Sequence, residues 1–208
     1  MTPPRTRPGL RSILHLSLLV AWLAGCAGSG PPPVVTDGGG LVLAEDEGLF
    51  VVHVDSEVPI ERLLLSDREI ASNLPIGRHL FVVRLPAGSY EWTRIELRGD
   101  DGRLVLHDPR RIDLENDREF EVEIRAGHLS YAGELLVAKI LASGSYGWMS
   151  LRNRNHSAMA VRSLLETSPD LIDRFPLHYG GSSGDGFLEH YSRERRRVRA
   201  ASGDGSEG

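Results

Sequence analysis

The stretch Arg118-Glu119-Phe120-Glu121-Val122-Glu123-Ile124-Arg125 is the clearest indication of fold in this 208-residue chain. Its apolar residues alternate with charged ones, so in an extended strand the three apolar side chains point to one face. A strand with one buried and one solvated face is typical of antiparallel sheets. We therefore expect a β-strand over residues 118–125.

Other strand-like stretches lie on both sides of this one, separated by turn signals. They are residues 49–54, 60–65, 78–85, 90–97, 104–106, 128–141 and 146–153. Short strands at this spacing predict a sandwich or barrel. We expect a mainly β protein, an immunoglobulin-like antiparallel β-sandwich over residues 41–153.

Three details of the strands are specific enough to check. Residues 78–85 and 90–97 flank the turn Pro86-Ala87-Gly88-Ser89, which predicts a hairpin. The parity of the apolar residues changes within 90–97, which predicts a β-bulge near Thr93 or Arg94. The second half of 128–141 carries apolar residues of both parities, so we expect it to be covered on both sides.

The pattern changes after Asn155, a plausible N-cap. Apolar residues then recur at helical spacings, at Val161, Leu164, Leu165, Ile172 and Phe175. Pro169 is placed to begin a second short helix. We expect residues 154–179 to form a helical extension, the C-terminal helix, packed on the edge or end of the sandwich. Residues 180–208 are rich in Gly, Ser, Asp and Arg, which predicts a disordered tail.

Two phrases resemble a known family of domains. They are residues 82–90, VVRLPAGSY, and residues 120–133, FEVEIRAGHLSYAG. Both resemble the strand–turn–strand patterns of transthyretin-like or carboxypeptidase-regulatory-like domains, which also occur in uncharacterised bacterial lipoproteins. The resemblance spans roughly residues 41–176. It implies a β-sandwich that faces the periplasm, and it implies no catalytic residues.

The N-terminal segment has the parts of an export signal. Arg5, Arg7 and Arg11 precede an apolar run over residues 13–24. As a helix this run would span roughly 18 Å, short of the ~30 Å hydrocarbon core of a bilayer. The run ends in Leu23-Ala24-Gly25-Cys26, which resembles the lipobox of bacterial lipoproteins.

The lipobox resemblance implies that residues 1–25 are a signal peptide removed before Cys26, whose sulfur then carries a diacylglycerol. An ordinary signal peptide, or a signal anchor with an incidental cysteine, is the alternative. Ala27, where an Asp would imply retention in the inner membrane, implies sorting to the outer membrane on its periplasmic side. Residues 26–40 are rich in Gly and Pro and are interpreted as a tether.

Composition narrows the classes of function. Removal of residues 1–25 takes away three arginines and no acid, so the formal charge falls from −5 to −8. This balance argues against a nucleic-acid binder. Cys26 is the single cysteine, so neither a disulfide framework nor a cysteine-based metal site forms within one chain.

The residues that carry chemistry show no recognisable catalytic, cofactor or metal motif. The seven histidines after residue 25 are scattered, at His53, His79, His107, His128, His156, His178 and His190. The row Glu119, Glu121 and Glu123 is interpreted as a solvated strand face, and residues 181–186 as a flexible loop. His107-Asp108 is interpreted as a turn, and the basic cluster over residues 193–199 as a solvated tail that can meet anionic lipid or an acidic partner.

We therefore expect no cofactor and no enzymatic activity. The expected function is a membrane-anchored cell-envelope lipoprotein, a non-catalytic binding or structural module with an envelope protein as partner. Two alternatives stay open: a periplasmic hydrolase with a site assembled from distant strands, and a small-ligand carrier. A pocket that gathers two histidines and a carboxylate would favour the hydrolase, and an apolar cavity inside the β domain would favour the carrier.

Overall fold

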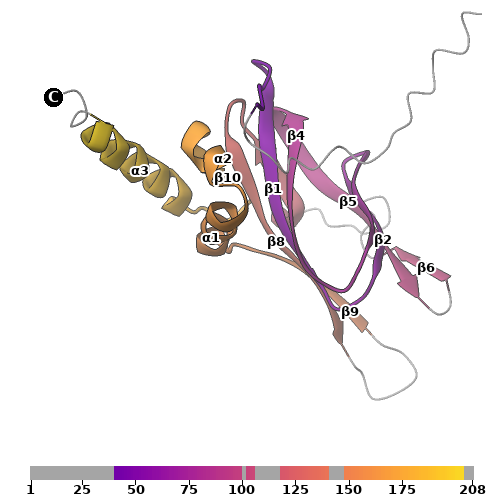
Figure 1. Cartoon of the computed structure of the whole chain (residues 1–208). Helices are drawn as coiled ribbons and strands as arrows, with labels where there is room; N and C mark the ends of the chain where they lie inside the picture. Colours follow the sequence, from indigo (N-terminus) through magenta and orange to yellow (C-terminus); the bar gives the residue numbers. More distant parts are fainter. Residues whose placement is uncertain (1–39, 100–101, 106–117, 141–147, 204–208) are drawn as a thin grey trace, which may run out of the picture. The chain divides into compact units, whose positions relative to one another are not determined.

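The computed structural model describes residues 40–99, 102–105, 118–140 and 148–203 (Figure 1). Cys26, the signal segment, His107-Asp108 and most of the proposed tether lie outside these residues. The described part contains two five-stranded sheets and three α-helices. The prediction of a mainly β, sandwich-like fold with a C-terminal helix is confirmed.

The first sheet has the strand order β10 (Leu177–Tyr179), β8 (Leu129–Ile140), β1 (Glu47–Ser56), β4 (Gly77–Pro86), and β9 (Trp148–Arg154) also pairs with β8. The second sheet has the order β3 (Arg68–Leu74), β2 (Ile60–Leu65), β5 (Gly88–Gly99), β6 (Gly102–Val105), and β7 (Glu121–Ile124) also pairs with β5. The first sheet is mixed, because β8 runs parallel to β1 and to β10. The second sheet is antiparallel.

Strand β1 separates two cores. Phe50, Val52 and Val54 pack with residues of the second sheet, whereas Leu49 and Val51 pack with the helices. All five side chains are fully buried, which explains why this stretch is a continuous apolar run and does not alternate. The domain is therefore layered as helices, first sheet and second sheet.

The opening stretch forms the predicted strand over half of its length. Arg118–Phe120 form a short 3₁₀ turn, η1, and β7 follows. Phe120, Val122 and Ile124 are buried in the core between the sheets, and Glu121 and Glu123 are exposed. The alternation thus reports correctly which face of the strand is buried.

The predicted hairpin between residues 78–85 and 90–97 is wrong. β4 pairs with β1 in the first sheet, whereas β5 pairs with β2 in the second. The turn after Pro86 therefore carries the chain from one sheet to the other. Both strands face the same core, so their alternation is identical to that of a hairpin, and sequence pattern does not distinguish the two arrangements.

The predicted bulge is confirmed in β5. Leu64 pairs with Arg94 and Leu65 pairs with Trp92, so Thr93 is the extra residue. The Thr93 hydroxyl donates a hydrogen bond to the Ser66 carbonyl in the neighbouring turn. That turn joins β2 to β3, a strand the sequence patterns did not predict, and Ser66 has a positive φ of 51°.

Strand β8 changes face at Gly133. Tyr131 belongs to the helix-side core, while Leu135 and Val137 belong to the core between the sheets. The register with β1 shifts at the same place, between Val51 and His53. The first half of β8 is covered on both sides, not the second half as expected, because Lys139 is exposed while residues 129–135 are buried.

The C-terminal helices cover a face of the first sheet, so the expectation that they pack on an edge or end is wrong. Helices α1 (Ser157–Thr167) and α2 (Pro169–Arg174) bury Ala160, Val161, Leu164, Leu171 and Ile172 against β1 and β8. Pro169 begins α2 as predicted. The Asn155 carboxamide oxygen accepts a hydrogen bond from the Ser157 amide at 3.0 Å, in the first turn of α1.

The prediction that residues 180–208 are disordered is wrong for most of that range. Phe187–Gly203 form helix α3 (Figure 1). Leu188 is fully buried in the helix-side core. The Ser192 hydroxyl accepts a hydrogen bond from the Leu177 amide at 2.7 Å, and the Glu189 carboxylate accepts one from His178 Nδ1 at 2.7 Å. These tertiary contacts stabilise α3 although its sequence contains few apolar residues.

Candidate functional site

Buried charge gathers where β1, β4 and β8 meet the start of α1. The Glu134 side chain is 2% exposed, and its Oε1 lies 3.0 Å from Arg78 Nη2. The other oxygen lies 2.7 Å from His156 Nδ1, and the same Arg78 nitrogen lies 2.8 Å from Asp55 Oδ2. We name Glu134, Arg78, Asp55 and His156 the Glu134 cluster. Removing a carboxylate from water is costly unless a cation accompanies it, and here Arg78 does so.

His53 lies beside this cluster and is itself buried. Its Nδ1 lies 3.3 Å from the Tyr131 hydroxyl and its Nε2 lies 3.1 Å from the Ser163 hydroxyl. Burial, together with the positive charges of Arg78 and His156, lowers the pKa of His53 to about 4. Burial also raises the pKa of the Tyr131 phenol, as does the negative charge of Glu134. His53 is therefore neutral at ordinary pH.

This arrangement partly meets the criterion set for a hydrolase. His156 contacts the carboxylate of Glu134, and His53 is the register partner of Glu134 where β1 pairs with β8. A serine hydrolase, however, needs a carboxylate behind the histidine to stabilise the imidazolium that forms. The group behind His53 is the Tyr131 phenol, and the nearby Arg78 opposes protonation. The geometry fits a structural polar network better than a general base.

A second polar group joins α1 to α3. The Asp185 carboxylate accepts hydrogen bonds from Asn155 Nδ2 at 2.8 Å and from the Ser157 hydroxyl at 2.6 Å. Its other oxygen accepts one from the Phe187 amide at 2.9 Å, at the start of α3. Burial raises the pKa of Asp185, but the hydrogen bonds from Ser157 and Asn155 outweigh it and lower the pKa overall. The loop over residues 181–186 thus positions α3.

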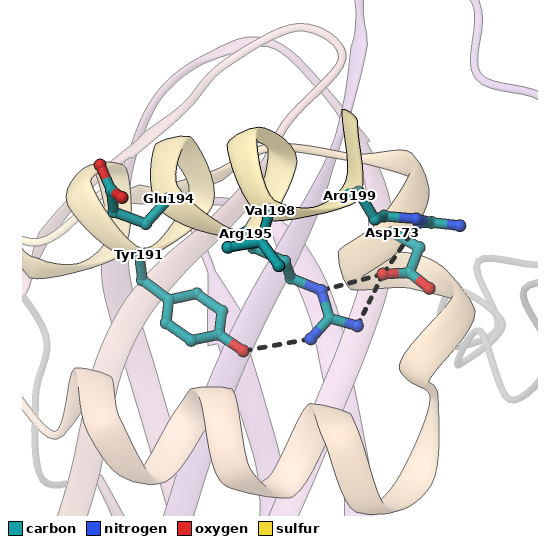
Figure 2. Close-up of a pocket in the computed structure, with 6 residues that line it drawn as sticks. All are labelled: Asp173, Tyr191, Glu194, Arg195, Val198 and Arg199. Atoms are coloured by element: carbon teal, nitrogen blue, oxygen red, sulfur yellow. Dashed lines mark hydrogen bonds and ion pairs between the residues drawn. The ribbon is translucent and has the colours of Figure 1, made fainter. Parts of the chain in front are cut away.

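A groove of about 460 Å³ lies along α3, opposite the end of α2. Figure 2 shows its lining residues, and Asp173 is the group on which two arginines converge. Arg195 Nη2 and Nε lie 2.7 and 2.9 Å from Asp173 Oδ1, and Arg199 Nη1 lies 3.0 Å from it. The hydrogen bond to Asp173 raises the pKa of Arg195. Arg195 Nη1 also contacts the Tyr191 hydroxyl at 3.3 Å.

A smaller cavity of about 70 Å³ adjoins this groove and shares Asp173, Arg195 and Arg199 with it. Its lining adds Arg174 from α2 and Arg196 from α3. We name this smaller cavity, which four arginines line together with Asp173, the arginine cavity. The basic cluster over residues 193–199 was recognised in the sequence, but neither Arg174 nor the helical arrangement of the cluster was. Leu188 and Tyr191, three residues apart, were the available signal that this segment has a buried face.

Other residues considered in the sequence have structural surroundings. Glu123 contacts Arg125 at 3.0 Å, and Glu119 accepts a hydrogen bond from the Asn153 amide at 2.7 Å. His79 and His128 contact nearby backbone carbonyls at 3.0 and 2.7 Å. Among the residues that the structure describes, no three His, Cys, Asp or Glu side chains are grouped to hold a metal ion.

The core between the sheets is filled by large side chains, among them Trp92 and Phe50. Trp92 is fully buried, and its ring meets that of Phe50 edge to face with centroids 5.8 Å apart. A carrier would need an apolar cavity in this place, so the packing does not favour one.

Two further findings concern membrane-spanning helices and similarity to known proteins. In the described ranges, no helix combines the length and the apolar character needed to span a bilayer. Comparison with protein-family models, with curated proteins and with solved structures finds no match to this chain.

Proposed function

We propose that this chain is a lipid-anchored protein of the bacterial cell envelope, and that its folded part is a non-catalytic binding or structural module. One observation carries the proposal. Three arginines, a twelve-residue apolar run and the sequence Leu23-Ala24-Gly25-Cys26 follow one another in the order that a lipoprotein signal requires. The transthyretin-like resemblance is compatible with such a protein.

The chemistry of the anchor suits a permanent attachment. Each buried CH₂ contributes about 0.8 kcal/mol, so one acyl chain holds a protein marginally and two or three hold it stably. Fourteen residues follow Cys26 before Leu41, where the folded part begins. At ~3.4 Å per residue they reach at most about 50 Å. The domain therefore stays near the membrane and can meet an envelope protein there.

The folded part supports a binding or structural role through its charged groups. Arg78 contacts both carboxylates of the Glu134 cluster, and the nitrogens of His53 contact Tyr131 and Ser163. Exposed positive charge instead gathers on α3, whose arginines include Arg193, Arg197 and Arg199. A surface of that kind recruits anionic partners.

The experiment follows the full chain in a Gram-negative bacterium, with a chemically labelled fatty acid in the medium. Wild-type protein is expected to take up the label and to fractionate with the outer membrane. Cys26→Ser is expected to lose the label, because no sulfur is present to form the thioether. Ala27→Asp is a matched variant, since it keeps the cysteine, and is expected to keep the label but to move to the inner membrane.

Two outcomes would refute the proposal: a wild-type chain that takes up no label, or a Cys26→Ser chain that takes up as much label as the wild type. If Ala27→Asp keeps the label but does not change membranes, the outer-membrane assignment is wrong and the anchor stands.

A further inference from the structure

The arginine cavity concentrates positive charge in an otherwise acidic protein. Four guanidinium groups, from Arg174, Arg195, Arg196 and Arg199, line it together with a single carboxylate, Asp173. Guanidinium groups stay protonated at all ordinary pH values. The cavity therefore carries three positive charges in excess, and an anion that entered it would relieve their mutual repulsion.

The cavity has both the room and the donors for an oxyanion. Its volume of about 70 Å³ is several times the ~10–15 Å³ that holds one water molecule. Arg195 is held by Asp173 and Tyr191, so its position is fixed. Arg196 contacts the Ser192 carbonyl through Nε at 3.2 Å, and Arg199 contacts Asp173 through Nη1. A guanidinium group can donate two parallel hydrogen bonds to the oxygens of a phosphate group, which suits Arg196 and Arg199 to such a ligand.

The place of the cavity indicates where the phosphate comes from. Arg174 donates a hydrogen bond to the carbonyl of Leu41 and lies over the ring of Phe175, 5.3 Å from its centroid. Leu41 is the residue at which the segment following Cys26 reaches the folded part. The arginine cavity is thus at the end of the domain that a lipid anchor on Cys26 would draw toward the membrane.

Exposed apolar side chains line two grooves that share residues with the cavity. Val198 is 63% exposed and lines the α2–α3 groove, and Val42 is 78% exposed in the segment after Leu41. Arg174 and Phe175 line both the arginine cavity and the groove beside Val42. A basic surface flanked by apolar residues is the combination that binds at an anionic bilayer surface.

We infer that the arginine cavity binds the phosphate group of anionic lipid headgroups, so that the α2–α3 side of the domain rests on the membrane that holds its anchor. This inference rests on the proposed lipid anchor for the choice of lipid over a soluble phosphate. The anchor restricts the domain to the surface, and the cavity then determines which side faces it.

The test uses residues 26–208, the chain that remains once the signal peptide is removed, with Cys26→Ser in every sample, so that neither an acyl chain nor the apolar run over residues 13–24 contributes to binding. Sedimentation measures its partition onto vesicles of phosphatidylcholine with and without phosphatidylglycerol. The test variant Arg196→Gln/Arg199→Gln removes two arginines that line the cavity. The control Arg193→Gln/Arg197→Gln removes two exposed arginines of the same helix that do not line it. Both variants change the charge equally, and thermal unfolding checks that both remain folded.

We expect the test variant to bind phosphatidylglycerol vesicles roughly tenfold more weakly, and the control about twofold more weakly. High salt should weaken the binding of the parent chain, because surface charges are screened within about 3 Å at 1 M salt. Equal losses in the two variants would overturn the inference, since the helix charge as a whole would then bind. Binding that ignores phosphatidylglycerol would overturn it as well.

A second arm separates lipid from soluble phosphate. Calorimetric titration with inorganic phosphate on the same three proteins is expected to show weaker binding than the vesicles do. If inorganic phosphate bound through Arg196 and Arg199 while the vesicles showed no dependence on these residues, the lipid source would be wrong. Because every sample lacks Cys26, these results do not depend on the fractionation experiment, and the anchor and the cavity can fail separately.

Discussion

Glu134 Oε2 lies 2.7 Å from His156 Nδ1, although the Glu134 side chain is only 2% exposed. The contact joins the middle of β8 to the residue that precedes α1, twenty-two positions later in the chain. Arg78 of β4 contacts the other carboxylate oxygen at 3.0 Å. One buried carboxylate on β8 thus contacts both β4 and the residue that precedes α1.

Glu134→Gln is predicted to destabilise the protein. Arg78 would lose its counter-charge and His156 its contact with the carboxylate, and because both are partly exposed we expect a loss of about 1–3 kcal/mol, less than for a fully buried pair. Urea denaturation measures this. Glu121→Gln, on the solvated face of β7, is the control and should change the free energy of unfolding by less than about 0.5 kcal/mol. A Glu134→Gln protein as stable as the control would contradict the role assigned to the cluster.

The free energy of unfolding is predicted to decrease as the pH is lowered, because of His53. Its pKa is about 4 in the folded protein, below the 6.5 of an unperturbed histidine, so between these values the unfolded chain binds a proton that the folded chain does not. Lowering the pH through this window therefore favours unfolding, by up to ~1.4 kcal/mol per pH unit for one proton. Denaturation at several pH values, from 7 to 4, measures the slope. His53→Gln should reduce it, and a slope that does not change in that variant would show that other groups cause it.

Gly133→Ala is predicted to be strongly destabilising. Gly133 has φ of +101°, and an added Cβ would lie 2.4 Å from Asn153 Oδ1 and 2.9 Å from the Arg154 carbonyl. Backbone strain alone costs of order 1–3 kcal/mol, and the collision adds to it. Gly77→Ala is the matched control, since Gly77 has φ of +122° with open space around its Cβ position. The difference in melting temperature between the two variants isolates the collision, and equal losses would mean that β9 moves aside freely.

Leu188→Ala is predicted to loosen α3. Leu188 is fully buried against the helix-side core, and removing a buried leucine costs about 2–5 kcal/mol where the site does not collapse. Hydrogen exchange should then show faster exchange of the α3 amides than of the β1 amides. Val198→Ala, at a position 63% exposed, should leave exchange unchanged. Unchanged protection of α3 in Leu188→Ala would show that its polar contacts suffice.

The alternating strands were predictable from the sequence because alternation is a local property, whereas β3 was not predicted. Phe120, Val122 and Ile124 show their buried face without reference to any partner, and the bulge at Thr93 follows from a change of parity within one strand. Partners are not local. β4 and β5 have the pattern of a hairpin and yet lie in different sheets, because two strands that face one core from opposite sides alternate in the same way.

The candidate site was less predictable still. The histidines form no sequence motif, and their spacing along the chain gave no sign that His156 would contact Glu134. The arginines of residues 193–199 were noticed as charge, whereas the carboxylate that orders two of them, Asp173, lies in a different helix. Convergence of residues twenty or more positions apart is decided by packing.

By itself, then, the sequence determined the mainly β class, the buried face of each clear strand and the helical nature of α1 and α2. The tertiary structure decided which strands pair, which face of the first sheet the helices cover and that α3 exists. An isolated helix of seventeen residues with few apolar side chains is marginal in water. Helix α3 forms because Leu188 packs in the helix-side core, Ser192 contacts β10 and Arg195 contacts α2. Those partners come together only in the folded chain.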